Sequence, residues 1–129
     1  MLVVDASVIA PAIADGGPDG EICRDRIKGE LLAAPDLLRI EVLSVLRRHV
    51  NTGQLSPRQA SNAVDDLMNL PITAYPTAPL IRRCWELRGN VTAYDACYVS
   101  LAEALGSTLL TADARLAKAP GTRCRFDVV

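Results

Sequence analysis

The sequence has little of what most metal centres and disulfide frameworks require. It contains a single histidine, His49, which excludes a histidine-rich metal site. Its four cysteines form no C-x-x-C pair and fit no zinc spacing. We therefore interpret the cysteines as small buried hydrophobes, above all Cys97 and Cys124, and expect a reducing, cytoplasmic compartment.

Long apolar runs and a strong charge of one sign are also missing. No apolar stretch approaches the roughly 20 residues that a membrane-spanning helix needs, and the apolar start of the chain has no basic segment and is interrupted by Asp5. We expect neither a signal peptide nor a membrane association. The formal net charge of −1 does not indicate nucleic-acid binding. A polyanionic substrate would have to be held locally, by metal ions or by a small basic patch.

The residues that are present favour one compact α/β domain over residues 1–129. Half of the chain is hydrophobic, and a domain of this size needs no disulfide or zinc to fold. Buried strands are expected at 2–4, 31–34, 72–75, 108–111 and 123–126. Helices are expected at 8–14, 21–28, 36–51, 57–69, 79–88, 93–105 and 113–119, with a loop at 15–20. This alternation predicts a mainly parallel sheet of four to five strands with helices on both faces.

Two acidic residues follow strands of the expected sheet. Asp5 comes directly after the first strand, and Asp113 lies just past the fourth. Ligands of open parallel sheets bind beyond the carboxyl ends of the strands, so both residues are placed at the functional edge. Each could instead cap the helix that follows it. Neither residue taken singly separates these two interpretations.

Asp95 is more informative because its helical neighbours are apolar. Tyr98, Val99 and Ala102 share its face of the expected helix. Burying an unpaired charge is costly, so such a carboxylate has a partner or a metal. The alternative is a capping box that begins at Thr92, with Asp95 at the third helical position where Glu or Gln is usual. The apolar neighbours favour a functional role.

Glu41 borders the apolar face of its helix and is a weaker fourth candidate, because exposed helical glutamates are common. Grouped together, Asp5, Glu41, Asp95 and Asp113 would repel each other unless a cation lay among them. Oxygen ligands without histidine or thiolate favour Mg²⁺ or Mn²⁺ over zinc. A water activated by such an ion points to a phosphodiester substrate.

Hydroxyl and guanidinium groups stand beside two of these acids. Ser7 and Thr111 could orient Asp5 and Asp113 or contact a phosphate, and local capping is the alternative. Arg115 follows Asp113 by two residues and could approach a phosphate.

Trp85 is the one tryptophan of the chain. A base-stacking role is conceivable for it. Its expected helix places Ile81, Cys84 and Arg88 near the same face, so core or interface packing is the favoured interpretation.

Taken together, these stretches resemble PIN-domain ribonucleases, and specifically VapC-type toxins of bacterial type II toxin–antitoxin pairs. The matching stretches are residues 2–7, 35–48 around Glu41, 92–98 and 110–113, in the family's order over nearly the whole chain. The Thr-Ala-Tyr-Asp-Ala and Leu-Thr-Ala-Asp stretches are fairly specific, whereas the first is short. All four acidic positions of the family pattern are filled.

The resemblance implies a three-layer α/β/α fold and a metal-dependent endoribonuclease. It implies Mg²⁺ as cofactor, with Mn²⁺ as a substitute, and toxicity through RNA cleavage. It makes Asp5, Glu41, Asp95 and Asp113 the catalytic residues, with the three aspartates as metal ligands. It also implies a homodimer and a cognate antitoxin whose C-terminal segment blocks the site.

Three rival functions remain open. A haloacid-dehalogenase-like phosphatase would use Asp5 as nucleophile but has an aspartate where Ser7 stands here. A receiver-like signalling domain needs a late lysine beyond a strand, and Lys118 is poorly placed for that role. The third alternative is a PIN-like module that binds RNA without cutting it.

Overall fold

A five-stranded sheet forms the centre of the computed structural model, which describes residues 1–129. All the strand pairs are parallel, and the strand order is β3-β2-β1-β4-β5. The strands are β1 (Leu2–Val4), β2 (Leu32–Pro35), β3 (Ile72–Tyr75), β4 (Thr108–Thr111) and β5 (Phe126–Val128). The expected parallel sheet is confirmed.

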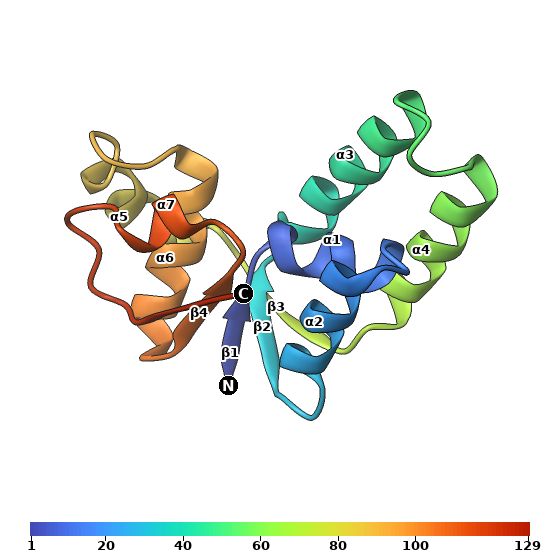
Figure 1. Ribbon diagram of the computed structural model, residues 1–129. Coiled ribbons are helices and arrows are strands. Elements are labelled where there is room, and N and C mark those ends of the chain that lie inside the picture. The colour runs from blue at the N-terminus through green and yellow to red at the C-terminus, as the bar shows by residue number, and fades with distance from the viewer.

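Helices cover both faces of this sheet, as Figure 1 shows. One side holds α1 (Ala6–Ala14), α2 (Pro18–Ile27), α3 (Leu38–Asn51) and α4 (Pro57–Asn69), with α1 in contact with the other three. The other side holds the 3₁₀ turn η1 (Ala78–Leu80), α5 (Ile81–Glu86), α6 (Ala93–Leu105) and α7 (Ala114–Ala117). On that side α6 packs against β1, β2 and β4. The three-layer architecture is therefore confirmed, and none of the helices is long and apolar enough to cross a membrane.

The central strand β1 decides where a ligand can bind. Val3 pairs with Ala33 of β2 on one side and with Leu109 of β4 on the other. The chain builds β2 and β3 on one side of β1 and then returns to build β4 and β5 on the opposite side. Such a reversal opens a crevice at the carboxyl ends of the two central strands. The residues that follow β1 and β4 therefore lie beside each other.

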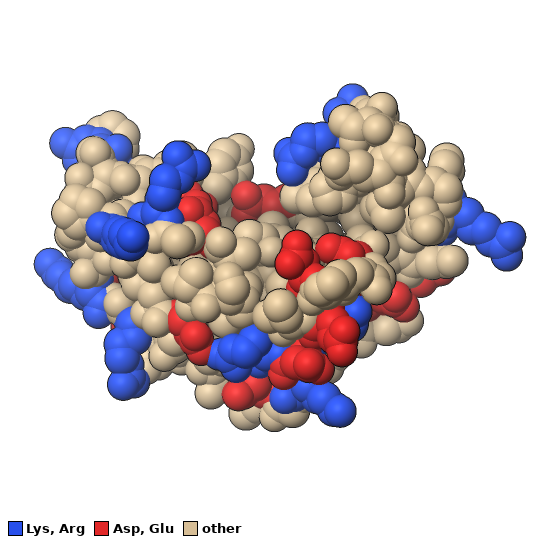
Figure 2. Space-filling model, in the orientation of Figure 1, with Lys and Arg blue, Asp and Glu red and all other residues tan.

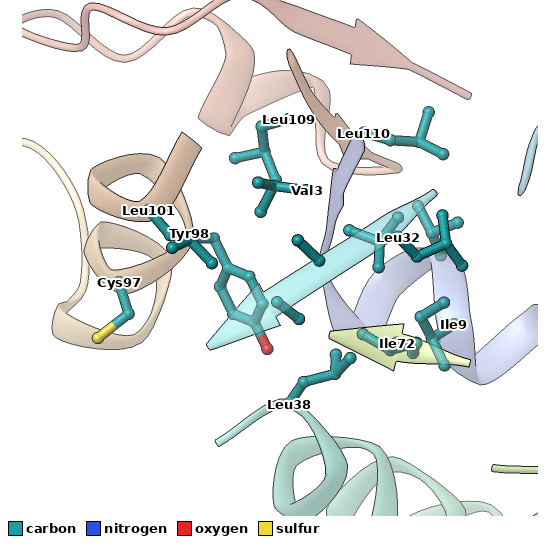
Figure 3. Packing of buried hydrophobic residues seen from close by; sticks show 14 of the residues in the cluster. Val3, Ile9, Leu32, Leu38, Ile72, Cys97, Tyr98, Leu101, Leu109 and Leu110 are labelled. Carbon is teal, nitrogen blue, oxygen red and sulfur yellow. The ribbon is translucent and has the colours of Figure 1, made fainter. Parts of the chain in front are cut away.

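The core is one cluster of 28 buried residues on both faces of the sheet. Val3 of β1 and Leu109 of β4 are fully buried in it. Figure 3 shows the Tyr98 ring extending from α6 toward Leu38 at the start of α3. The two helical layers thus meet beyond the carboxyl edge of the sheet.

The last strand lies further along the chain than expected, at 126–128 instead of 123–126. The Arg123 N–H donates to Oε2 of Glu103 at 2.7 Å, so this residue's backbone is engaged by α6 and not by the sheet. Pairing with β4 begins at Phe126, which lies opposite Leu109. Arg26 of α2 forms an ion pair with Asp127 in the strand.

The second helix begins at Pro18, so the expected loop over 15–20 is too long. Proline suits the first helical turn because its missing N–H needs no partner there. Oδ1 of Asp15 accepts the Gly17 N–H at 2.7 Å and tightens the turn before the helix. Gly20 lies so close to this turn that an added Cβ would stand 1.9 Å from the Asp15 carbonyl oxygen. Glycine is thus required inside α2 by close packing.

Smaller shifts affect other boundaries. β2 runs from Leu32 to Pro35, and Leu31 before it has its side chain exposed to solvent. The Asp36 N–H donates to the Tyr75 carbonyl at 2.8 Å and prolongs the sheet, so α3 begins at Leu38. The helix expected at 79–88 is divided into η1 and the shorter α5, which ends at Glu86.

The cysteines are free thiols, as expected, but they differ in burial. Cys97 is buried in the core, which agrees with the expectation. Cys124 is only half-buried and packs against the edge of the core, because it precedes β5 instead of lying within a strand. For Cys124 the expectation of full burial is therefore wrong.

Candidate active site

Asp5 lies at the carboxyl end of β1 with 5% of its surface exposed. It is the N-cap of α1, and its Oδ1 accepts from both the N–H, at 3.1 Å, and the hydroxyl of Ser7. Its Oδ2 accepts from the Thr111 hydroxyl at 2.6 Å. Burial raises the pKa of Asp5, the two hydroxyls offset part of that rise, and the charge of Asp95 adds to it. Asp5 thus caps a helix and also faces the other acids.

Ser7 and Thr111 connect the first strand to the fourth. The two hydroxyl oxygens lie 3.3 Å apart. Ser7 Oγ accepts the Ala112 N–H at 2.9 Å, and Thr111 Oγ1 accepts the Asp113 N–H at 3.1 Å. Both side chains therefore hold the Asp5 carboxylate against the segment that carries Asp113.

Asp95 lies half-buried in the first turn of α6. Its N–H donates to Oγ1 of Thr92 at 3.1 Å, so Thr92 is the N-cap of the helix. A complete capping box exists in α4, where the Ser56 and Gln59 side chains both bond, but α6 has only the threonine half. Burial raises the pKa of Asp95, the Thr92 side chain partly offsets the rise, and the charge of Asp113 adds to it.

Glu41 lies in the first turn of α3, and its Oε1 accepts from the Tyr98 hydroxyl at 2.6 Å. Burial raises the pKa of Glu41, the tyrosine bond opposes the rise, and the charges of Asp95 and Asp5 add to it. Sequence reasoning treated Tyr98 only as an apolar neighbour of Asp95. A tyrosine in a buried stripe needs a partner for its hydroxyl, and that is the signal by which it could have been found.

Asp113 is half-buried and caps α7. Its Oδ1 accepts the N–H groups of Arg115 and Leu116, at 2.9 and 3.3 Å. Both bonds fall on one oxygen, so the cap does not occupy the whole carboxylate. Capping and a place in the acidic group are therefore compatible at this residue.

A cleft of about 580 Å³ extends from Asp95 and Asp113 toward α5. Its polar lining is Arg88, Asn90, Thr92, Asp95, Asp113 and Arg115. Figure 2 shows a hollow between two raised lobes, with acidic side chains within it and basic side chains along the lobes. The expected neighbourhood of Arg115 and Asp113 is found here, whereas Arg88 and Asn90 were not identified from the sequence.

Trp85 stands near this cleft and does not pack in the core, so that part of the expectation is wrong. Its side chain is 67% exposed. Cys84 of α5 and Leu87, which follows the helix, are buried, which leaves the tryptophan facing solvent. The Arg88 guanidinium lies over the indole, 4.5 Å from the ring centroid.

The negative charges of the four acids influence one another, mostly through Asp95. Its charge raises the pKa of Asp5 and of Glu41, and Asp113 raises the pKa of Asp95 in turn. No three side chains of His, Cys, Asp or Glu converge into a metal-binding group. The carboxylates are instead held separately, by Ser7 and Thr111, by Tyr98, and by the first turn of α7. The donor chemistry nevertheless fits Mg²⁺, because it consists of oxygen ligands whose shared negative charge a hard cation would offset.

A parallel α/β/α sheet with four acids at its carboxyl edge is the arrangement expected of a PIN domain, and the PIN domain family model matches residues 2–121. The chain belongs to the PIN-domain family.

Within that family the chain is similar to ribonucleases of the VapC type. Ribonuclease VapC1 of Mycobacterium tuberculosis is 45% identical over 128 residues, which cover 98% of this chain and 96% of the relative. The VapC ribonuclease Mb0985 of Mycobacterium bovis is 40% identical over 129 residues, covering 100% of this chain and 98% of the relative.

Solved structures share the fold. Mycobacterium tuberculosis VapC20, described as a sarcin-ricin loop cleaving toxin, superposes with a TM-score of 0.73 at 15% identity and covers 95% of this chain and 97% of its own. PAE2754 of Pyrobaculum aerophilum has a TM-score of 0.69 at 26% identity and covers 98% and 83%. VapBC2 of Rickettsia felis, bound to a promoter DNA fragment, has a TM-score of 0.68 at 14% identity and covers 98% and 97%.

Proposed function

We propose that this protein is a Mg²⁺-dependent endoribonuclease that acts as the toxin of a toxin–antitoxin pair. The observation that carries the proposal is the group of acids at the carboxyl edge of the sheet, where Asp5 after β1 bonds to Thr111 of β4 and Asp95 and Asp113 line one cleft. The curated relatives that cover the chain end to end are named as ribonucleases, which supports RNA as the substrate.

Asp5, Asp95 and Asp113 are proposed as the residues that hold Mg²⁺, with Mn²⁺ as a substitute. The bound ion would supply Lewis-acid chemistry, polarising the phosphodiester and an attacking water. Ser7 and Thr111 orient the Asp5 carboxylate through its two oxygens. Arg115, which lines the cleft next to Asp113, binds a phosphate of the substrate.

Glu41 is proposed as the group that accepts the proton of the attacking water. Its raised pKa suits a general base better than that of an ordinary surface glutamate. Tyr98 occupies Oε1, which leaves Oε2 to accept the proton. Because the tyrosine comes from α6 and the glutamate from α3, the position of the base depends on the contact between these helices.

A cognate antitoxin and a second copy of the chain are proposed as partners. Large apolar side chains are exposed beside the acids: Ile40 is 66% exposed next to Glu41, and Tyr94 is 62% exposed next to Asp95. A protein that covered these side chains would lie next to two of the proposed catalytic residues, Glu41 and Asp95. The solved structure of VapBC2 from Rickettsia felis, bound to a promoter DNA fragment, has the same fold, which supports an antitoxin as a partner of this chain.

The test is cleavage of RNA by purified, partner-free protein. We expect cleavage with Mg²⁺ or Mn²⁺, none in excess EDTA, and none by Asp95→Asn with Mg²⁺. Asp65→Asn is the matched control, because Asp65 is an exposed aspartate on α4 and lies outside the cleft. Full activity in EDTA would contradict the metal mechanism. RNA binding without any cleavage product would favour the module that binds without cutting.

A further inference from the structure

Two side chains that the proposed catalytic mechanism does not use form a pair beside the cleft. Nη1 of Arg88 donates to the Trp85 carbonyl at 2.9 Å, and the guanidinium lies over the indole of the same residue. The two contacts fix the arginine against the ring. Because the tryptophan remains 67% exposed, its aromatic surface stays accessible to a planar ligand.

The cleft also holds positive charges that no carboxylate neutralises. The ion pairs of the protein use Arg26 and Arg83, and neither Arg88 nor Arg115 takes part in one. Both of these unpaired arginines line the cleft with Asp95 and Asp113. A cation that forms no ion pair with a carboxylate is suited to bind an anion that enters the cleft.

We propose that Trp85 and Arg88 form a binding subsite for an unpaired nucleotide of the RNA substrate. The base stacks on the Trp85 indole, and Arg88 binds the adjoining phosphate at the entrance to the cleft. Aromatic surfaces bind single-stranded nucleic acid in this way because every base has a face for stacking. A base paired within a helix cannot reach such a surface, so the subsite selects single-stranded segments. The inference rests on the proposed function only in taking RNA as the substrate.

RNA fits this pair better than a second copy of the chain does. Arg88 is continuous with the cleft that contains the proposed catalytic acids, so a strand that reaches Asp95 and Asp113 passes the guanidinium. A protein surface placed over Trp85 would enclose the unpaired charge of Arg88, which is costly without a carboxylate to meet it. The phosphates of an RNA strand supply the negative charge that Arg88 would otherwise lack.

Trp85 is the only tryptophan, so intrinsic fluorescence reports on the subsite directly. Wild-type protein in EDTA is titrated with a short single-stranded oligouridylate and with a blunt-ended RNA duplex of equal phosphate number. We expect the single strand to quench the emission at a concentration about tenfold lower than the duplex does. Arg88→Gln should weaken quenching by about tenfold, whereas Arg82→Gln, an exposed α5 arginine outside the cleft, should leave it unchanged.

Binding of a labelled oligouridylate, followed by anisotropy, tests the ring itself. Trp85→Phe should retain most of the affinity and Trp85→Leu should lose it by about tenfold. Emission that is unaffected by an oligonucleotide bound to the protein would overturn the proposal. A blue shift that grows with protein concentration in the absence of RNA would also overturn it, because a second copy would then cover the indole.

These measurements are independent of cleavage. Quenching by single-stranded RNA from a protein that cuts no RNA with Mg²⁺ would support the subsite and contradict the proposed nuclease. Cleavage of RNA with Mg²⁺ by a protein whose tryptophan emission is not quenched by single-stranded RNA would support the proposed nuclease and contradict the subsite.

Discussion

At the residue scale, neutral donors hold the carboxylates of Asp5, Glu41 and Asp113. Asp5 is the clearest case, because a carboxylate with 5% exposure keeps both oxygens bonded to Ser7 and Thr111. No buried side-chain nitrogen or oxygen in the protein is without a hydrogen-bond partner. The site therefore leaves no buried polar side-chain atom without a partner while it carries an excess of negative charge.

Two substitutions of Asp5 separate the effect of its hydrogen bonds from the effect of its negative charge. Asp5→Ala removes the acceptor of the Ser7 and Thr111 groups, and we expect the free energy of unfolding to fall by about 2 kcal/mol. Asp5→Asn keeps an acceptor for the N-cap and should cost less than half as much, while still abolishing cleavage. Urea unfolding and an RNA cleavage assay measure the two effects. Equal destabilisation by both variants would show that the charge, and not the hydrogen bonds, governs stability here.

Tyr98 is expected to position Glu41. Tyr98→Phe removes the donor to Oε1, so the pKa of Glu41 should rise further. The acid limb of the pH profile of cleavage should then move to higher pH, with a loss of about 1 kcal/mol in stability. Tyr94→Phe is the matched control, because the Tyr94 hydroxyl forms no hydrogen bond and its side chain is 62% exposed. An unchanged pH profile in Tyr98→Phe would argue against Glu41 as the base.

At the scale of the element, the position of Asp95 depends on how α6 begins. The sequence indicates this start clearly, because Thr92 precedes the helix and Gly106 ends it in a left-handed conformation with φ of 61°. The sequence places α2 (18–27) and β5 (126–128) incorrectly for a different reason. The close approach of Gly20 to Asp15 and the bond from Arg123 to Glu103 are tertiary contacts that no local pattern contains.

Removing the cap of α6 should disturb catalysis through Asp95. Thr92→Ala deletes the acceptor of the Asp95 N–H, and we expect a loss of about 1 kcal/mol in stability together with slower cleavage. Thr92→Ser retains the hydroxyl and should restore both. Thermal unfolding and single-turnover cleavage provide the measurements. Full cleavage by a destabilised Thr92→Ala would show that the first turn is positioned by packing alone.

At the scale of the whole molecule, the grouped acids make the stability of the fold depend on pH. Asp5, Glu41 and Asp95 all have pKa values raised above their ordinary ones, so the folded protein binds these protons more tightly than the unfolded chain does. Their contribution to stability is complete below the ordinary pKa values of 3.8 and 4.5 and is lost as pH rises through the raised values.

Asp95→Asn isolates one of these contributions, because the amide resembles the protonated acid. In EDTA, the melting temperature of the variant minus that of the wild type should increase as pH rises through the raised pKa of Asp95. Calorimetry across that pH range measures the difference. Mg²⁺ at neutral pH should stabilise the wild type more than the variant, because ligand binding to the folded state adds to its stability. A difference that does not depend on pH would contradict the placement of Asp95 among like charges.

Local chemistry along the chain is enough to indicate the parallel α/β architecture and three of the four acids. The alternation of apolar runs with capped helices indicates the architecture. Asp5 and Asp113 follow strands, and Asp95 interrupts an apolar stripe. The identity of Glu41 depends mainly on the family pattern, because an isolated helical glutamate resembles any surface residue.

The tertiary structure alone decides which of these residues meet. The strand order brings Thr111 onto Asp5, and the packing of α6 on the sheet brings its Tyr98 onto Glu41 of α3. It also turns Trp85 outward and sets Arg88 over its ring. These contacts join residues far apart in sequence or fix which face of a short helix is buried. They depend on how the layers pack, and the local pattern of apolar and polar residues does not contain that information.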